Sequence, residues 1–138
     1  MPKNSKVKEP IWILDEIVLA VHRRQLAEHG GGDGIRDKGL LASALNKPKN
    51  LYHYSDPKPT ITALAASYAF AISSNHAFVD GNKRTAFIIC QLFLELNGYT
   101  LTAEAVEKYD TFIKLAASQM AETELAHWIS ENSVGIKD

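Results

Sequence analysis

Two apolar segments of helical length, separated by a short polar loop, constrain this chain more than any other feature. Residues 61–75 contain no charged side chain, and five alanines there favour a helix that neighbours can approach closely. In residues 83–97 the apolar side chains surround most of the helical circumference, which is typical of a helix at the centre of a fold. The sequence therefore predicts two buried helices joined by a loop at residues 76–82.

Four further helices complete the expected all-α fold. Pro48 should close the second helix and leave residues 49–59 irregular. Thr102 and Thr123 are suited to cap the last two helices. No strand-like alternation of useful length appears. Periodicity places the four helices near residues 15–29, 37–46, 102–119 and 123–132, and the fifth helix carries apolar side chains spaced for one face at Val106, Tyr109, Ile113 and Ala117.

Length and composition limit the classes of protein and function. We expect one domain over residues 1–138, with a mobile, lysine-rich arm at residues 1–10. An apolar content of 46% is typical of a globular protein, and a net charge of −1 gives no field that would attract nucleic acid or a membrane surface. The single cysteine, Cys90, excludes an internal disulfide, so we expect a buried thiol and a cytoplasmic protein.

The loop between the two buried helices carries an unusual density of polar groups. Residues 76–85 read His-Ala-Phe-Val-Asp-Gly-Asn-Lys-Arg-Thr. His76 is a candidate general base, because a neutral imidazole accepts a proton near neutral pH. Asp80 offers the hard oxygen ligand that Mg²⁺ prefers. Gly81 permits a tight turn whose backbone N–H groups converge on an anion, and Phe78 should anchor the loop in the core.

Three polar side chains follow at the start of the second buried helix. Asn82 can donate to an anion or cap the helix. Lys83 and Arg84 oppose the helix dipole unless an anion binds among them. Taken singly, each of these residues is more often structural than functional. Together, a base, a metal ligand, an anion-binding turn and two cations are the parts that phosphoryl or nucleotidyl transfer needs.

The segment from His76 to Phe87 resembles the central motif of the Fic family, His-Pro-Phe-x-(Asp/Glu)-Gly-Asn-Gly-Arg-x-x-Arg. It departs from that motif at Ala77, Lys83 and Phe87. The lysine and the missing second arginine are those of the Doc (death-on-curing) branch. Upstream, residues 34–45 are similar to a Gly-Leu/Ile-Arg-Asp-x-Gly-Leu-Leu-x-Ser-Ala segment of that branch. The similarity covers most of residues 12–130.

The resemblance implies a single-domain Fic/Doc bundle of about six helices, with the motif loop at the N-terminus of a central helix. It also implies a toxin of a type II toxin-antitoxin system. Such a toxin uses ATP and Mg²⁺ to phosphorylate a threonine or serine hydroxyl of a translation factor, elongation factor Tu, and so arrests translation. By the same resemblance, His76 is the catalytic base and Asp80 the metal ligand, and the phosphates bind at Gly81, Asn82, Lys83 and Arg84.

Two other functions stay open at this point. The first is transfer of AMP to a protein hydroxyl, against which Lys83 and Phe87 argue. The second is a catalytically silent module that binds an antitoxin, against which the presence of His76 together with Asp80 argues. Fic proteins are often restrained by a Ser/Thr-x-x-x-Glu-Gly/Asn helix, and residues 5–9 and 118–122 match only its first five positions. We therefore expect inhibition in trans by a cognate Phd-like antitoxin.

Several residues outside the motif are also candidates. Arg36 either contributes to a substrate or partner surface or pairs with Asp37, which is suited to cap the second helix. Tyr52 and Tyr54 are candidates for a flap over the site, where an acceptor peptide could add main-chain contacts. His22 is expected to be a structural or surface histidine.

Overall fold

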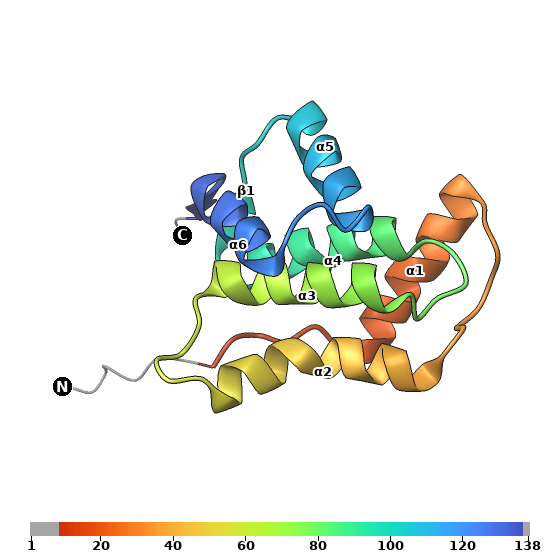
Figure 1. Cartoon of the computed structure of the whole chain (residues 1–138), viewed down its shortest axis with the longest axis horizontal. Coiled ribbons are helices and arrows are strands. Elements are labelled where there is room, and N and C mark those ends of the chain that lie inside the picture. Colours follow the sequence, from red (N-terminus) through yellow and green to blue (C-terminus); the bar gives the residue numbers. More distant parts are fainter. Residues whose placement is uncertain (1–8, 137–138) are drawn as a thin grey trace.

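A computed structural model describes residues 9–136, which form six helices and one two-stranded antiparallel sheet (Figure 1). The predicted all-α bundle of about six helices is confirmed, and the short sheet is an addition to it. The elements are α1 (Asp15–His29), α2 (Lys38–Tyr54), α3 (Ile61–Asn75), α4 (Asn82–Leu96), β1 (Tyr99–Leu101), α5 (Ala105–Ala116), α6 (Glu122–Glu131) and β2 (Ser133–Gly135).

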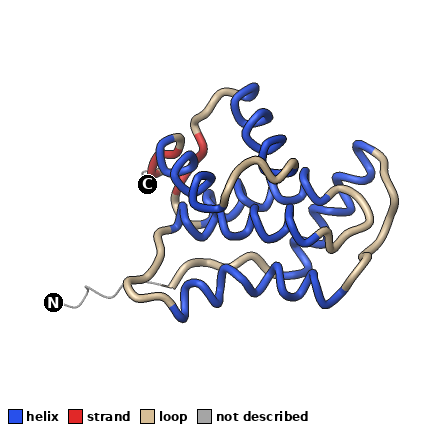
Figure 2. The backbone as a smooth tube through the Cα atoms, in the orientation of Figure 1, coloured by secondary structure: helices blue, strands red, loops and turns tan. Residues whose placement is uncertain are grey.

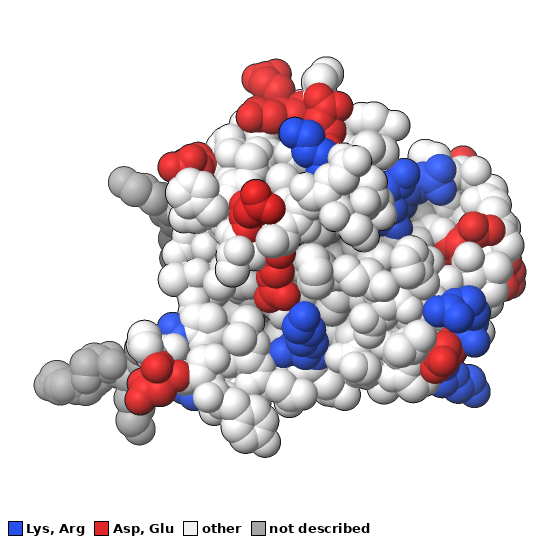
Figure 3. All heavy atoms as spheres, viewed as in Figure 1, with Lys and Arg blue, Asp and Glu red and all other residues white. Residues whose placement is uncertain are grey.

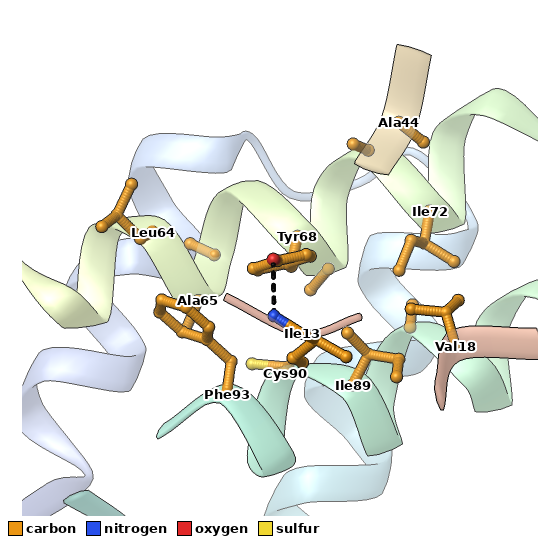
Figure 4. Close-up of a cluster of buried hydrophobic side chains, with 14 of the residues drawn as sticks. Ile13, Val18, Ala44, Leu64, Ala65, Tyr68, Ile72, Ile89, Cys90 and Phe93 are labelled. Atoms are coloured by element: carbon orange, nitrogen blue, oxygen red, sulfur yellow. Dashed lines mark hydrogen bonds between the residues drawn. The ribbon is translucent and has the colours of Figure 1, made fainter. Parts of the chain in front are cut away.

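The two central helices, α3 and α4, pack along each other, as their uncharged and all-round apolar sequences predict. α2 and α6 also pack against α3, and α1 packs against α4. Figure 4 shows the middle of this core, where Tyr68 and Ile72 of α3 meet Ile89 and Phe93 of α4. The alanines of α3 are fully buried at Ala65, Ala66 and Ala69 and leave room for close approach. Each large apolar side chain buried here contributes about 1.5–3 kcal/mol.

The segment before α1 passes between α2 and the α3–α4 pair (Figure 1). Ile13 N–H donates to Tyr68 Oη at 3.3 Å, as the dashed line in Figure 4 shows. Pro10 is buried, and Glu9 Oε2 accepts from Trp12 Nε1 at 2.7 Å. The prediction of a mobile arm over residues 1–10 is therefore wrong for residues 9 and 10. Residues 1–8 of that arm lie outside the described residues.

α2 runs through Pro48 to Tyr54, so the prediction that Pro48 ends this helix is wrong. A proline inside a helix costs about 3 kcal/mol. Burial of Pro48 and Tyr52 offsets that cost. In addition, Lys58 Nζ donates to the carbonyl oxygens of Tyr52 at 2.9 Å and His53 at 3.3 Å, which satisfies acceptors at the end of the helix.

Of the three predicted caps, Asp37 is correct and Thr102 and Thr123 are wrong, and Thr60 is a cap that the sequence analysis did not predict. Asp37 Oδ1 accepts from Leu40 N–H at 3.0 Å at the start of α2, and Thr60 caps α3. Thr102 instead bonds to the Asn132 carbonyl through its N–H at 2.6 Å and its Oγ1 at 2.9 Å, because β1 pairs with β2 just beside it. Thr123 lies inside α6.

The single apolar face predicted for the fifth helix is not buried as a unit. Val106 and Tyr109 of α5 are 72% and 66% exposed, whereas Phe112 and Leu115 are buried in the core. One side of α5 therefore stays open next to α4. No helix within residues 9–136 combines the length and the apolar character needed to cross a membrane.

Candidate active site

Two loops meet at one end of the central helix pair, on the right in Figures 1 and 2. The first is the motif loop, residues 76–81, which connects α3 to α4. The second is the glycine loop, residues 30–34, which follows α1. In Figure 2 the two loops lie side by side although Gly32 and Asp80, which are bonded across them, are 48 residues apart in the chain. This meeting brings the chemically active side chains together.

The motif loop pairs with the stretch of chain just before α2. The N–H groups of Arg36 and Asp37 both donate to the Ala77 carbonyl oxygen, at 2.7 and 3.1 Å. Val79 N–H donates to the Gly34 carbonyl oxygen at 3.1 Å. The upstream segment that resembles the Doc branch therefore builds one wall of the motif loop.

His76 ends α3 in the left-handed conformation, with φ 52° and ψ 44°, and its side chain is exposed. A positive φ is uncommon for a residue with a side chain and persists where surrounding contacts hold it. Here Arg36 Nε donates to the His76 carbonyl oxygen at 2.7 Å, and Arg36 Nη2 donates to the Asn75 carbonyl oxygen at 3.4 Å. The guanidinium thus binds the end of α3. No ion pair between Arg36 and Asp37 is found within residues 9–136, so the alternative in which they pair is wrong, whereas the predicted Asp37 cap is confirmed.

Phe78 is buried, and its ring stacks on the buried His22 ring with centroids 3.7 Å apart and planes 10° apart. Asn82 closes the loop from the other side. Its Oδ1 accepts from Phe78 N–H at 3.1 Å, and its Nδ2 donates to the Phe78 carbonyl oxygen at 3.0 Å. The amide of Asn82 therefore serves the loop itself, and one hydrogen of Nδ2 remains for a ligand.

Asp80 is exposed, and neighbouring segments contact it at two points. Gly32 N–H donates to Asp80 Oδ2 at 2.6 Å, and His22 Nε2 lies 2.8 Å from the Asp80 carbonyl oxygen. The next residue, Gly81, has φ 82°, a conformation that glycine adopts without strain. That turn places the Asp80 carboxylate directly before the first residue of α4.

The N-terminus of α4 presents free backbone donors. Its first intrahelical bond runs from Thr85 N–H to the Gly81 carbonyl oxygen at 3.0 Å, and no side chain caps this end. The N–H groups of Asn82, Lys83 and Arg84 are therefore available to a ligand. The side chains of Lys83 and Arg84 are exposed at the same place. Such a helix end, with its dipole and two cations, favours a phosphate.

The molecular surface agrees with this local picture. Figure 3 shows lysine and arginine side chains gathered at the right-hand end of the molecule, where the motif loop lies in Figure 1, with acidic side chains between them. Because the net charge of the chain is −1, the attraction for anions at this end is local.

A groove of about 540 Å³ lies between α4 and α5, next to this helix end. The motif analysis did not predict this groove. The apolar spacing along the fifth helix was an available signal, because it indicates a continuous apolar face on that helix. An apolar hollow next to a phosphate-binding helix end suits a ligand that joins a ring system to phosphates. The lining residues are Lys83, Arg84, Phe87, Gln91, Ala105, Lys108, Tyr109, Phe112 and Ile113.

Tyr52 and Tyr54 do not approach the motif loop, so their predicted place in a flap over the site is wrong. α2 starts beside the motif loop and contains 17 residues, which places its far end about 25 Å away. At that end Tyr52 is buried with its ring centroid 5.7 Å from that of Trp12, and Tyr54 is 87% exposed.

Comparison with known proteins agrees with the geometry. Residues 12–94 match the Fic/DOC family. The chain is 40% identical over 75 residues to the toxin Doc of Mycolicibacterium smegmatis (strain ATCC 700084 / mc(2)155), a match that covers 54% of this chain and 58% of that protein. It is 30% identical over 86 residues to the protein kinase doc of Escherichia phage P1, covering 62% of this chain and 68% of that protein. The chain belongs to the Fic/Doc family and is of the Doc type.

Proposed function

We propose that this chain is the toxin of a type II toxin-antitoxin system and acts as an ATP-dependent protein kinase. Its substrate would be a threonine or serine hydroxyl of elongation factor Tu in the cytoplasm, and phosphorylation would arrest translation. One observation carries the proposal: a short loop begins at an exposed histidine and ends at an uncapped helix end with two cations. The names of the two relatives, a toxin and a protein kinase, support it.

The proposed reaction uses few protein groups. The acceptor hydroxyl oxygen attacks the γ-phosphorus of ATP, the bond to the β–γ bridging oxygen breaks, and ADP leaves. His76 takes the proton of the hydroxyl. The N–H groups at the start of α4, together with Lys83 and Arg84, hold the phosphate oxygens and stabilise their charge. The groove between α4 and α5 has room for the base and sugar of the nucleotide.

Asp80 suits a magnesium ion that arrives with the nucleotide. Within residues 9–136, no group of three or more His, Cys, Asp or Glu side chains is arranged to hold a metal ion. A single carboxylate fits Mg²⁺, which is commonly bound by one or two carboxylates, substrate phosphates and water. Oδ2 of Asp80 accepts one hydrogen bond from Gly32, which leaves the carboxylate acceptor capacity with which it would hold the ion. The ion would neutralise charge on the phosphates.

Lys83 favours transfer of the γ-phosphate over transfer of AMP. AMP-transferring relatives carry glycine at this place in the motif. A lysine adds bulk and charge at the helix end, where its exposed side chain lines both the phosphate site and the groove. A nucleotide that lies against it would therefore be displaced from the position found in those relatives.

We further propose that a Phd-like antitoxin inhibits this toxin in trans. The partial inhibitory match at residues 118–122 runs from the turn after α5, where Ser118 has φ 59°, to Glu122 at the start of α6, so it does not form the helix that the inhibitory pattern requires. Of the other partial match, at residues 5–9, only Glu9 lies in the described chain.

The direct test incubates the purified chain with elongation factor Tu and ATP labelled at either the α- or the γ-phosphate. Label from the γ-phosphate alone, lost in His76→Ala and kept in His127→Ala, is the expected result. His127 is an exposed histidine on α6 and serves as the matched control. Label from the α-phosphate would make the enzyme an AMP transferase. No label from either position would contradict elongation factor Tu as the target, and a whole-lysate acceptor screen would then separate another target from a silent module.

A further inference from the structure

We propose that α1 and the glycine loop together orient Asp80, with His22 and Gly32 as positioning residues for its carboxylate. This inference rests on the proposed role of Asp80 as the ligand of Mg²⁺. Two contacts carry it, one to the main chain of Asp80 and one to its side chain. Neither residue belongs to the motif.

His22 holds the main chain of the turn. Its side chain is only 3% exposed, and its Nε2 lies 2.8 Å from the Asp80 carbonyl oxygen. Because a carbonyl oxygen only accepts hydrogen bonds, Nε2 carries the proton and donates it. The same ring stacks on Phe78, and a Cβ at Gly81 would come within 3.4 Å of it. One buried imidazole from α1 therefore contacts the loop on both sides of Asp80.

Gly32 holds the carboxylate itself. Its N–H donates to Asp80 Oδ2 at 2.6 Å, a short distance typical of a charge-assisted bond. Glycine is needed here for close approach and not for backbone conformation, since Gly32 is not among the glycines with positive φ. A Cβ at this position would lie 2.8 Å from Val79 Cγ1 and 3.1 Å from Asp80 Oδ2.

The contact with Gly32 has a specific electrostatic consequence. Lys83 and Arg84 follow Asp80 within one helical turn, and a free carboxylate would be attracted to them. Yet none of the ion pairs found within residues 9–136 includes Asp80. Instead, Oδ2 bonds to Gly32 in the glycine loop. The carboxylate would then keep acceptor sites for a metal ion, and both cations would remain for phosphate.

The test measures binding of Mn²⁺, as a probe for the Mg²⁺ site, to the full chain with a non-hydrolysable ATP analogue. The signal of free Mn²⁺ in electron paramagnetic resonance gives the Kd without any turnover. We expect Gly32→Ala to weaken Mn²⁺ binding by about 10–100-fold, because the new Cβ would push the Asp80 carboxylate away from the N–H at position 32, and losing an outer-shell partner usually costs that much. Affinity for the analogue without metal should stay near that of the wild type.

Val79 supplies the matched control, because the new Cβ at position 32 also presses on its side chain. Val79→Ala alone should bind Mn²⁺ as the wild type does. Gly32→Ala combined with Val79→Ala removes the contact at 2.8 Å but keeps the contact with Asp80 Oδ2 at 3.1 Å. We expect the double variant to remain weakened. Full recovery in the double variant would overturn the inference, since the effect would then pass through Val79.

Two variants of His22 test its role, because each keeps only one of its two features, the N–H donor or the stacked ring. His22→Phe keeps the stacking on Phe78 but loses the N–H, whereas His22→Gln keeps a donor and loses the stacked ring. We expect His22→Phe to weaken Mn²⁺ binding and His22→Gln to retain more of it. Thermal unfolding without metal shows whether each variant is folded. If His22→Phe fails to fold, Gly32→Ala still decides, because Gly32 lies in a loop.

Asp80→Asn distinguishes the two proposals. If Asp80→Asn binds Mn²⁺ as the wild type does, the proposed metal role of Asp80 is wrong. If Asp80→Asn loses Mn²⁺ while Gly32→Ala and His22→Phe bind it with unchanged Kd, the metal role stands and the positioning inference is wrong.

Discussion

At the scale of the residue, Arg36 connects the start of α2 to the histidine that would act as the base. It lies outside the motif, and its guanidinium binds two carbonyl oxygens at the end of α3. A cation at a helix C-terminus is also favoured by the helix dipole. The left-handed conformation of His76 depends on such contacts, so Arg36 affects where the imidazole points.

We expect Arg36→Gln to lower kcat for the proposed transfer by roughly ten- to a hundredfold, because a misplacement of about 1 Å can cost a hundredfold in rate. KM for ATP should change little, since Arg36 is not part of the groove. Steady-state kinetics at saturating ATP give the answer. Lys38→Gln, which removes a neighbouring exposed cation, is the control. An unchanged kcat in Arg36→Gln would show that other contacts hold His76.

Cys90 and Tyr68 give the folded state a dependence on alkaline pH. Burial raises the pKa of Cys90 from 9.0 to about 12, and burial also raises the pKa of Tyr68 above 10.0. Above about pH 9 the unfolded chain therefore releases these protons before the folded chain does.

The free energy of unfolding should thus fall by about 1.4 kcal/mol per pH unit for each group, from about pH 9 for Cys90 and only from about pH 10 for Tyr68. Urea unfolding at about pH 8 and about pH 10 measures this fall. Cys90→Ala should reduce the slope of the free energy of unfolding against pH by the contribution of about one proton. A slope that Cys90→Ala leaves unchanged would mean that the thiol titrates alike in both states.

Most single residues of the candidate site could be named from the sequence, because the motif is contiguous. His76, Asp80, Lys83 and Arg84 do lie together at one end of α4. The contacts of Gly32 and His22 could not be predicted. They are main-chain contacts across long sequence separations, 48 and 58 residues, and leave no pattern in the local sequence.

At the scale of the element, the start of α2 is hydrogen-bonded directly to the motif loop. Its cap residue, Asp37, binds Leu40 N–H through the side chain and the Ala77 carbonyl oxygen through its own N–H. One residue thus begins the helix and holds the loop.

We expect Asp37→Ala to lower the free energy of unfolding by about 1 kcal/mol, the usual cost of losing an N-cap. Asp37→Ser keeps a capping oxygen and should lose only a fraction of that. Urea unfolding followed by circular dichroism compares the three chains. Equal stability of Asp37→Ala and the wild type would mean that α2 needs no cap at this end.

Elements were predictable where a long run favours a buried helix, as the uncharged, alanine-rich run of α3 and the all-round apolar run of α4 do. Local rules failed where tertiary contacts override them. Pro48 signals a helix end, but burial and the Lys58 contact carry α2 to Tyr54. The strands β1 and β2 have three residues each, too few for an alternating pattern to stand out.

At the scale of the whole molecule, the segment before α1 ties the far end of the bundle together. Asn97 Oδ1 accepts from Ile11 N–H at 2.8 Å, and Asn97 Nδ2 donates to the Ile11 carbonyl oxygen at 3.0 Å. Next to Ile11, the ring of Trp12 packs with its centroid 5.7 Å from that of Tyr52 and 5.9 Å from that of Phe93.

We expect Trp12→Ala to destabilise the fold by about 3 kcal/mol, as large-to-small changes in packed aromatic clusters do. Activity at low temperature should remain, because this cluster lies at the opposite end of the bundle from the motif loop. Ile11→Ala is the control, since that side chain is 57% exposed. Loss of activity in a Trp12→Ala chain that is still folded would contradict the separation of the two ends.

The pairing of the chain before α2 with the motif loop also sets an order of events during synthesis. Because the chain emerges from its N-terminus, the partners of the loop at residues 22–37 leave the ribosome well before residue 76. A domain generally folds as a unit, so the loop is held only once α4 has followed. A truncated chain that stops before α4 has the early partners and even the histidine, but nothing on its far side to hold that histidine in place.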